Sequence, residues 1–164
     1  MTKALRRIPL AIFQHELKGH PTRTAHWCLV ALFSLQKATI FELVGNTDTY
    51  GYVCSETNEF HTSYPSLRGG VKVGSVPEDQ HAIDWLKGIL ATIDIHKHDV
   101  KRFDCQFWVL AALKMLNSSE LGGMKEHGVV LDGLNEAAIR MELLEERERW
   151  ERGDDTFHER EYSI

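Results

Sequence analysis

The stretch KRFDCQFWVLAALKML, residues 101–116, is an apolar run with one thiol, Cys105, close to its start. From Cys105 onward the run is apolar almost all round, which predicts the central helix of a domain, buried on several sides. The first N–H groups of a helix have no internal partners, and the helix dipole is positive there. A thiolate at that point is stabilised, and the same N–H groups can hold an oxyanion. Cys105 is therefore a candidate nucleophile, and the alternative is a small buried apolar residue.

Strands are predicted on the N-terminal side of this helix, at residues 7–13, 25–33 and 38–44, because each is an apolar, β-branched or aromatic run between polar turns. A short strand is also predicted at 52–55. Residues 55–78 are rich in Ser, Thr, Gly and Pro, which predicts a long loop. Because long loops in compact domains often carry function, we expect this one to be a candidate substrate lid.

Two further helices are predicted, over about 80–94 and over 132–151, from the helical spacing of their apolar residues. In the second helix the apolar repeat is read at Leu134, Ala138, Met141 and Leu144. Together these elements predict an α+β fold, in which a small antiparallel sheet packs on the helix that begins at Cys105 and an amphipathic helix follows. We expect one catalytic domain over residues 1–152 and a loose polar tail over 153–164.

Composition restricts the classes of function. The net charge of −5 and the pI near 6.0 argue against a nucleic-acid-binding protein, which usually carries a basic surface. No apolar run approaches the roughly 18 residues of a membrane-spanning helix, so no membrane partner is expected. Three cysteines make a disulfide framework improbable and indicate a reducing, cytoplasmic compartment. No motif predicts a cofactor or a metal site.

A base and an orienting group for the thiol are available on the predicted strands. His26 stands at the mouth of an otherwise apolar strand, where a polar imidazole needs a partner or a role. Glu42 is the ionisable residue among apolar neighbours of the next strand, and it can orient the imidazole or simply face solvent. His61 is the competing third member, with a surface loop position as its alternative. Trp27 and Trp108 are candidates for shaping an apolar acyl or side-chain pocket, or belong to the core.

The chain order of these residues carries a resemblance. His26 lies in AHWCLVALFSLQKATIFELVG, and Cys105 lies in FDCQFWVLAAL. A histidine strand, a polar residue on the following strand and then a cysteine at the start of an apolar helix resemble the circularly permuted papain-like superfamily. This superfamily includes PPPDE-type deconjugating peptidases, lecithin:retinol acyltransferase-like enzymes and permuted NlpC-type peptidases. The resemblance covers about residues 7–116 and is nearest to fungal proteins with an NCQxWV-type motif.

The resemblance implies a hydrolase that acts on an amide, ester or thioester, with a small-molecule acyl or a peptide or protein substrate. Its alternatives are an acyltransferase that passes the acyl group to an amine or alcohol, and a non-catalytic scaffold that binds a partner. Two residues depart from the family pattern. Asp104 replaces an Asn, and its carboxylate would oppose a thiolate unless it is paired, for example by Arg102. Glu42 replaces the second His of the acyltransferases. The helix over 132–151 is compatible with a monomer or with a homodimer that it would join.

Overall fold

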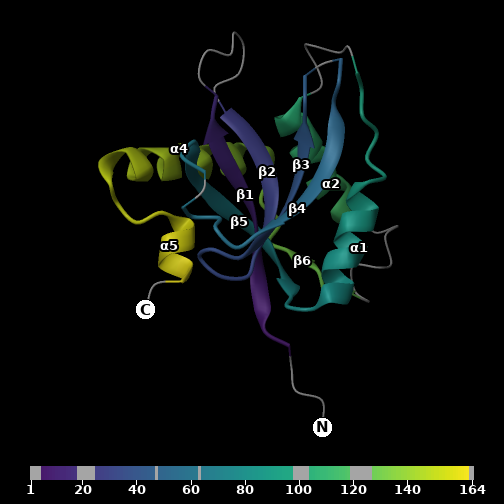
Figure 1. Cartoon of the computed structure of the whole chain (residues 1–164), viewed down its shortest axis with the longest axis horizontal. Helices are drawn as coiled ribbons and strands as arrows, with labels where there is room; N and C mark the ends of the chain where they lie inside the picture. The colour runs from purple at the N-terminus through teal and green to yellow at the C-terminus, as the bar shows by residue number, and fades with distance from the viewer. Residues whose placement is uncertain are drawn as a thin grey trace.

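The computed structural model describes residues 5–17, 25–46, 48–62, 64–97, 104–118 and 127–162. These residues form an α+β fold with one six-stranded antiparallel sheet (Figure 1). In that part of the chain the strands are β1 (Arg7–Glu16), β2 (Ala25–Leu32), β3 (Ala38–Val44), β4 (Gly51–Thr57), β5 (Leu67–Pro77) and β6 (Val130–Leu131), and the helices are α1 (Gln80–Leu90), α2 (Cys105–Leu116), α4 (Glu136–Arg152) and α5 (Phe157–Glu161). The α+β class is thus confirmed. Across the described ranges, none of these helices combines the length and the apolar character that crossing a membrane requires.

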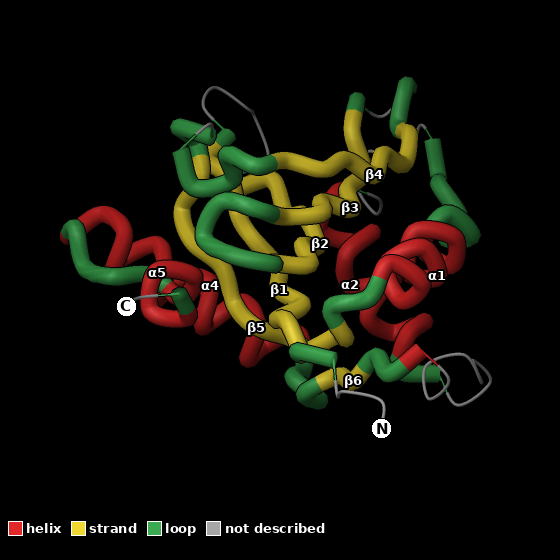
Figure 2. Tube along the Cα trace, turned by 60° about the horizontal axis from the view of Figure 1, so that its bottom comes forward, coloured by secondary structure: helices red, strands yellow, loops and turns green. Residues whose placement is uncertain are grey.

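The sheet has the order β4-β3-β2-β1-β5-β6, and each of its two faces has its own core. Successive side chains of a strand point to opposite faces. On one face Leu29 packs in the same core as Trp108 of α2, and on the other Val30 packs in the core that Phe157 of α5 covers. Figure 2 shows α1 and α2 on one side of the sheet and α5 on the other. Because both faces are covered, β2 can be apolar along nearly its whole length.

The prediction of a long loop and substrate lid over 55–78 is wrong for most of its length. Residues Leu67–Pro77 form β5, an 11-residue strand that pairs with β1, and β4 runs on to Thr57. Its glycines serve close packing rather than a loop. A Cβ atom at Gly70 would lie 2.6 Å from the carbonyl oxygen of Ile12 and 2.7 Å from the ring of Phe13, so only glycine fits there. The turn before β5 is also packed, since Phe60 is fully buried.

We expect Gly70→Ala to lower the free energy of unfolding by about 1–3 kcal/mol, because the added methyl group overlaps the β1 backbone. Gly88→Ala is the matched control. Gly88 lies inside α1, and beyond its own helix backbone nothing lies within 4 Å of its added Cβ, so alanine should stabilise the helix by up to about 1 kcal/mol. Urea unfolding of the two variants measures both effects. Equal stabilities of Gly70→Ala and the wild type would contradict the close approach of β5 and β1.

The buried stripe of α4 differs from the predicted one. The structure buries Ile139, Leu143 and Glu146, whereas Met141 and Leu144 are 65% and 58% exposed. The apolar residues of this helix fall on two stripes, and sequence spacing alone favoured the wrong one. Packing on β5 selects the other stripe.

Residues 157–161 form α5 where the sequence predicts a loose polar tail. Glu146 of α4 connects to this segment: its carboxylate accepts the Phe157 N–H at 2.8 Å and pairs with Arg160 at 2.6 Å. Thr156 and Glu159 form a capping box at the start of α5. His158 is fully buried against the sheet. The polar residues of this segment are therefore used for local caps and pairs, which composition cannot distinguish from a solvated tail.

Candidate active site

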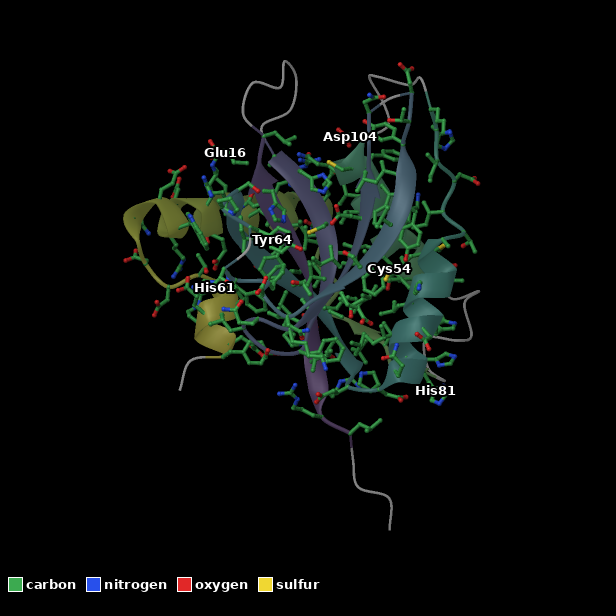
Figure 3. The ribbon with its side chains drawn as sticks, viewed as in Figure 1. Glu16, Cys54, His61, Tyr64, His81 and Asp104 are labelled. Atoms are coloured by element: carbon green, nitrogen blue, oxygen red, sulfur yellow. The ribbon has the colours of Figure 1, made fainter. Side chains whose placement is uncertain are left out.

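The predicted nucleophile is the first residue of α2, and its environment answers the question raised by Asp104. The Asp104 carboxylate accepts the backbone N–H of Phe107 at 2.7 Å, so this residue is the N-cap of the helix. Figure 3 shows Asp104 at the end of the sheet where α2 begins. The Arg102 partner considered from the sequence lies outside the described residues. Cys105 itself is a free thiol and is 5% exposed.

The two strands next to this helix separate at the same end. Pairing between β2 and β3 covers Leu29–Leu32 and Ala38–Phe41, and β3 runs on to Val44 paired with β4. Cys105 belongs to the core on the α2 side of the sheet. The side chain of His26 points to the same face of β2 as that of Cys28, which belongs to the core on the opposite side of the sheet. The thiol and the imidazole therefore approach each other where the sheet is no longer continuous between β2 and β3.

His26 lies between the thiol and a carboxylate. Its Nε2 is 3.7 Å from Oε1 of Glu42, and the side chains of His26 and Glu42 are 21% and 24% exposed. Burial by itself lowers the pKa of His26. A hydrogen bond to Cys105 and the contact with Glu42, together with the charges of the same two groups, outweigh that effect and raise the pKa to about 9. The structure thus brings together the three residues that the sequence singled out for catalysis.

A second histidine of this cluster, His15, was missed from the sequence. It lies directly opposite His26 in the β1–β2 pairing, with the ring centres 6.1 Å apart. Its Nδ1 is 3.1 Å from Ser66 Oγ, and its Nε2 is 3.9 Å from Cys28 Sγ. Burial, followed by the positive charge of His26, lowers the pKa of His15 to about 4, so this ring is neutral. The predicted strand ended at residue 13, and only its continuation to Glu16 turns His15 toward the site.

On the other side of Cys105, α4 contributes a residue that the sequence also did not indicate. Arg140 donates from Nη1 to Oε1 of Gln106 at 3.0 Å, and its guanidinium carbon lies 4.7 Å from the ring centre of Trp27. Gln106 in turn donates from Nε2 to the carbonyl oxygen of Ala25 at 3.0 Å. This chain of contacts ties α4, the start of α2 and the start of β2 together next to the thiol.

The three residues predicted to contact substrate have different positions. Trp27 lies beside the site but is only 3% exposed, and Arg140 covers its ring. Trp108 is fully buried and stacked on Tyr52, with ring centres 5.5 Å apart, so it offers no surface to a substrate. His61 lies near α5, away from Asp104 (Figure 3), and its Nδ1 is 2.8 Å from Nε2 of His158. Glu42, not His61, is therefore the third group beside His26.

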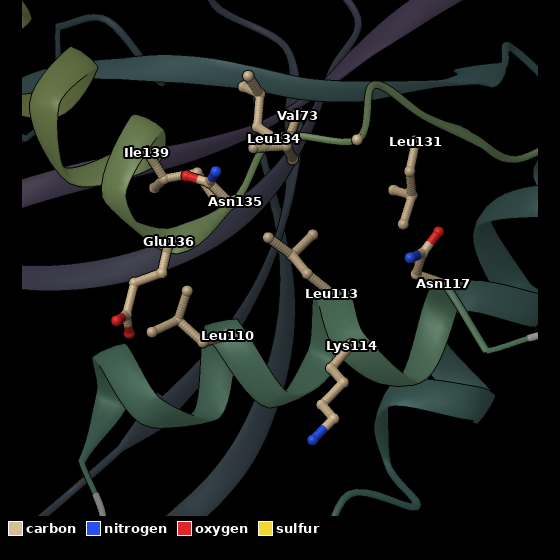
Figure 4. A pocket seen from close by; sticks show the side chains of 11 residues that line it. Val73, Leu110, Leu113, Lys114, Asn117, Leu131, Leu134, Asn135, Glu136 and Ile139 are labelled. Atoms are coloured by element: carbon tan, nitrogen blue, oxygen red, sulfur yellow. The ribbon is translucent and has the colours of Figure 1, made fainter.

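A cavity of about 360 Å³ lies further along α2, between this helix, the start of α4 and the β5–β6 edge (Figure 4). Its apolar wall consists of Val73, Leu110, Leu113, Leu131, Leu134 and Ile139. Leu110 and Leu113 share a face of α2 with Gln106, because residues three and four apart are neighbours on a helix. The cavity thus begins one turn beyond the residue that follows the nucleophile, and the Cys105 cluster is not part of its wall.

Among the described side chains, no group of three or more His, Cys, Asp and Glu residues is arranged to hold a metal ion. The comparisons with known proteins do not supply an assignment. No protein-family model matches the chain, no curated protein matches its sequence, and no solved structure matches its fold.

Proposed function

We propose that this protein is a thiol-dependent hydrolase of the permuted papain-like type, which cleaves an amide, ester or thioester through an acyl-enzyme on Cys105. One observation supports this function above all others: His26 lies between the Cys105 thiol and the Glu42 carboxylate, and its pKa is raised to about 9. Strongly shifted pKa values from specific partners are typical of functional sites. The residue order and the helix-start position of the thiol add to it.

His26 carries a proton in the resting protein. With a pKa of about 9 it remains an imidazolium at neutral pH, hydrogen-bonded to the side chain of Cys105. Its Nε2 lies 3.7 Å from Oε1 of Glu42. The Glu42 carboxylate orients the ring and stabilises its positive charge, as the third member of such triads does.

The reaction then takes two steps. The thiolate attacks the substrate carbonyl carbon, and the backbone N–H groups at the start of α2 stabilise the oxyanion. His26 gives its proton to the leaving amine, alcohol or thiol, and the acyl group remains on Cys105 as a thioester. In the second step the neutral His26 takes a proton from water, which attacks the thioester and releases the carboxylic acid and the thiolate. An amine or alcohol in place of that water would make the same site an acyltransferase.

The position of Asp104 weakens the main argument for a non-catalytic scaffold. A carboxylate facing the thiol would oppose thiolate formation. Because this carboxylate caps the Phe107 N–H, its role in the helix start accounts for its position beside the thiol without a retired site.

Reaction with p-nitrophenyl acetate tests the proposed function. We expect a burst of p-nitrophenolate and an acetyl group on the Cys105 peptide in the mass spectrum. Cys105→Ala should abolish both, whereas Cys54→Ala, which removes a half-buried thiol on β4, should keep both. If turnover rises with an added primary amine, the acyltransferase form applies. Absence of Cys105 acetylation, or equal acetylation of Cys54, would favour the binding scaffold.

A further inference from the structure

We propose that Arg140 is a specificity-determining residue, which selects substrates that carry a carboxylate or similar anionic group close to the scissile carbonyl. This inference rests on the proposed function of Cys105 and names the chemical class of its substrate. It starts from the contacts that hold one cation against Gln106, the residue that follows the nucleophile.

Two residues adjacent to the catalytic pair fix the position of Arg140. Gln106 follows Cys105 in the chain, and its Oε1 accepts the Arg140 Nη1 proton at 3.0 Å. Trp27 follows His26, and its ring lies 4.7 Å from the guanidinium carbon. Arg140 is therefore held by the residues that follow Cys105 and His26 in the chain, on the face of the sheet whose core contains Trp27 and Cys105.

The guanidinium is ordered before any substrate binds. Stacking on an aromatic ring and a hydrogen bond hold its plane, and a planar guanidinium offers further N–H donors in a geometry that suits a carboxylate. Trp27 is 3% exposed and cannot move aside easily, whereas the Arg140 side chain is 48% exposed. The guanidinium is thus held in place by Trp27, and the rest of the Arg140 side chain is accessible to a substrate.

The ion pair that Arg140 makes with Glu136 is weak, and a substrate anion could replace Glu136 in it. Nη2 of Arg140 lies 3.6 Å from Oε1 of Glu136 one turn earlier on α4, and the Glu136 side chain is 58% exposed. Exposed pairs of this kind contribute little to stability. A substrate carboxylate bound in bidentate geometry would replace Glu136, which is also at the rim of the apolar cavity along α2. Glu42, the anion on the other side of the thiol, is paired with His26.

Competition between two alkylating reagents tests this inference without a known substrate. Iodoacetate and iodoacetamide differ in the charge of one group, and the ratio of their rate constants at Cys105, read by mass spectrometry, reports the local field. We expect Arg140→Gln to lower the iodoacetate-to-iodoacetamide ratio about three- to tenfold, as the loss of one cation within several ångströms predicts. Arg140→Lys should lower the ratio less than Arg140→Gln does, because lysine keeps the positive charge but lacks the paired N–H donors of the guanidinium.

Arg147→Gln is the matched control, since it makes the same change on the same helix at a residue paired with Glu151. Its ratio should equal that of the wild type. An unchanged ratio in Arg140→Gln, or the same fall in Arg147→Gln, would overturn the inference. The ratio is measurable whatever the absolute rates are. Slow alkylation of Cys105 by both reagents would therefore count against the proposed nucleophile, while the ratio still decides the role of Arg140.

Discussion

His26→Ala is expected to slow the alkylation of Cys105 by iodoacetamide near pH 7 by about 30-fold or more. A thiol with the ordinary pKa of about 8.5 is only a few per cent thiolate at this pH, and the thiolate is the reactive form. In the proposed reaction the His26 imidazolium favours attack by the Cys105 sulfur through its hydrogen bond and its positive charge. Without the imidazole both effects disappear, and the rate should rise with pH as it does for an isolated thiol. Rates against pH, read on the Cys105 peptide, measure the change.

Two further variants decide the third member of the site. Glu42→Gln keeps the shape of the side chain and removes its charge, so the pKa of His26 should fall and the rate at pH 7 should fall with it. His61→Ala should leave the rate within about twofold, because His61 contacts His158 and lies away from α2. A large loss in His61→Ala, with none in Glu42→Gln, would reverse the assignment. No change in His26→Ala would remove the dyad altogether.

Mild acid is expected to destabilise the fold through two neutral histidines, the buried His158 and the partly buried His15. His158 is fully buried, its Nδ1 lies 3.3 Å from Thr156 Oγ1, and burial followed by the charge of His61 lowers its pKa to about 4. His15 has a pKa lowered to about 4 as well. Between pH 6.5 and 4 the unfolded chain binds protons at these positions that the folded chain does not. Stability therefore falls as the pH falls, by up to about 3 kcal/mol for each histidine once the pH reaches about 4.

His26 acts in the opposite direction above neutral pH. Its pKa in the folded chain is raised to about 9, so its contribution is complete below pH 6.5 and is lost as the pH rises through 9. Urea unfolding between pH 4 and 9.5 should consequently give a maximum near neutral pH. The losses of stability at acid and at alkaline pH arise in different parts of the molecule, since His158 lies in α5 and His26 belongs to the candidate active site.

The variant His158→Gln tests the contribution of His158 to the loss of stability at acid pH. The variant cannot gain a proton at this position, so its stability should be lower than that of the wild type at pH 7 but should depend less on pH between 6.5 and 4. His81→Gln is the control, because His81 is exposed on α1 and its loss should not alter the slope. The same pH dependence in His158→Gln and the wild type would show that His158 is not responsible.

Apolar runs and their boundaries were sufficient to predict several elements. The strand over 25–33 and the helix from Cys105 are the clearest cases, since nearly continuous apolar residues have no place except the interior. The same reasoning failed for β5, where glycines at Gly69, Gly70 and Gly74 resemble a loop. Gly70 and Gly74 are required by the close approach of β1 and β6, and Gly69 by its positive φ of 86°; these requirements exist only after the chain has folded.

The candidate site, too, could be predicted from the sequence only in part. The sequence by itself determined which residue types could act and where each one stands in its element: Cys105 first on a helix, His26 at the mouth of a strand and Glu42 on the next strand. Only the tertiary structure decided that Glu42 rather than His61 lies beside His26, and that His15 and Arg140 flank the pair. Strand register and the packing of α4 on the sheet set those distances. Both result from the whole core, which no local pattern of residues contains.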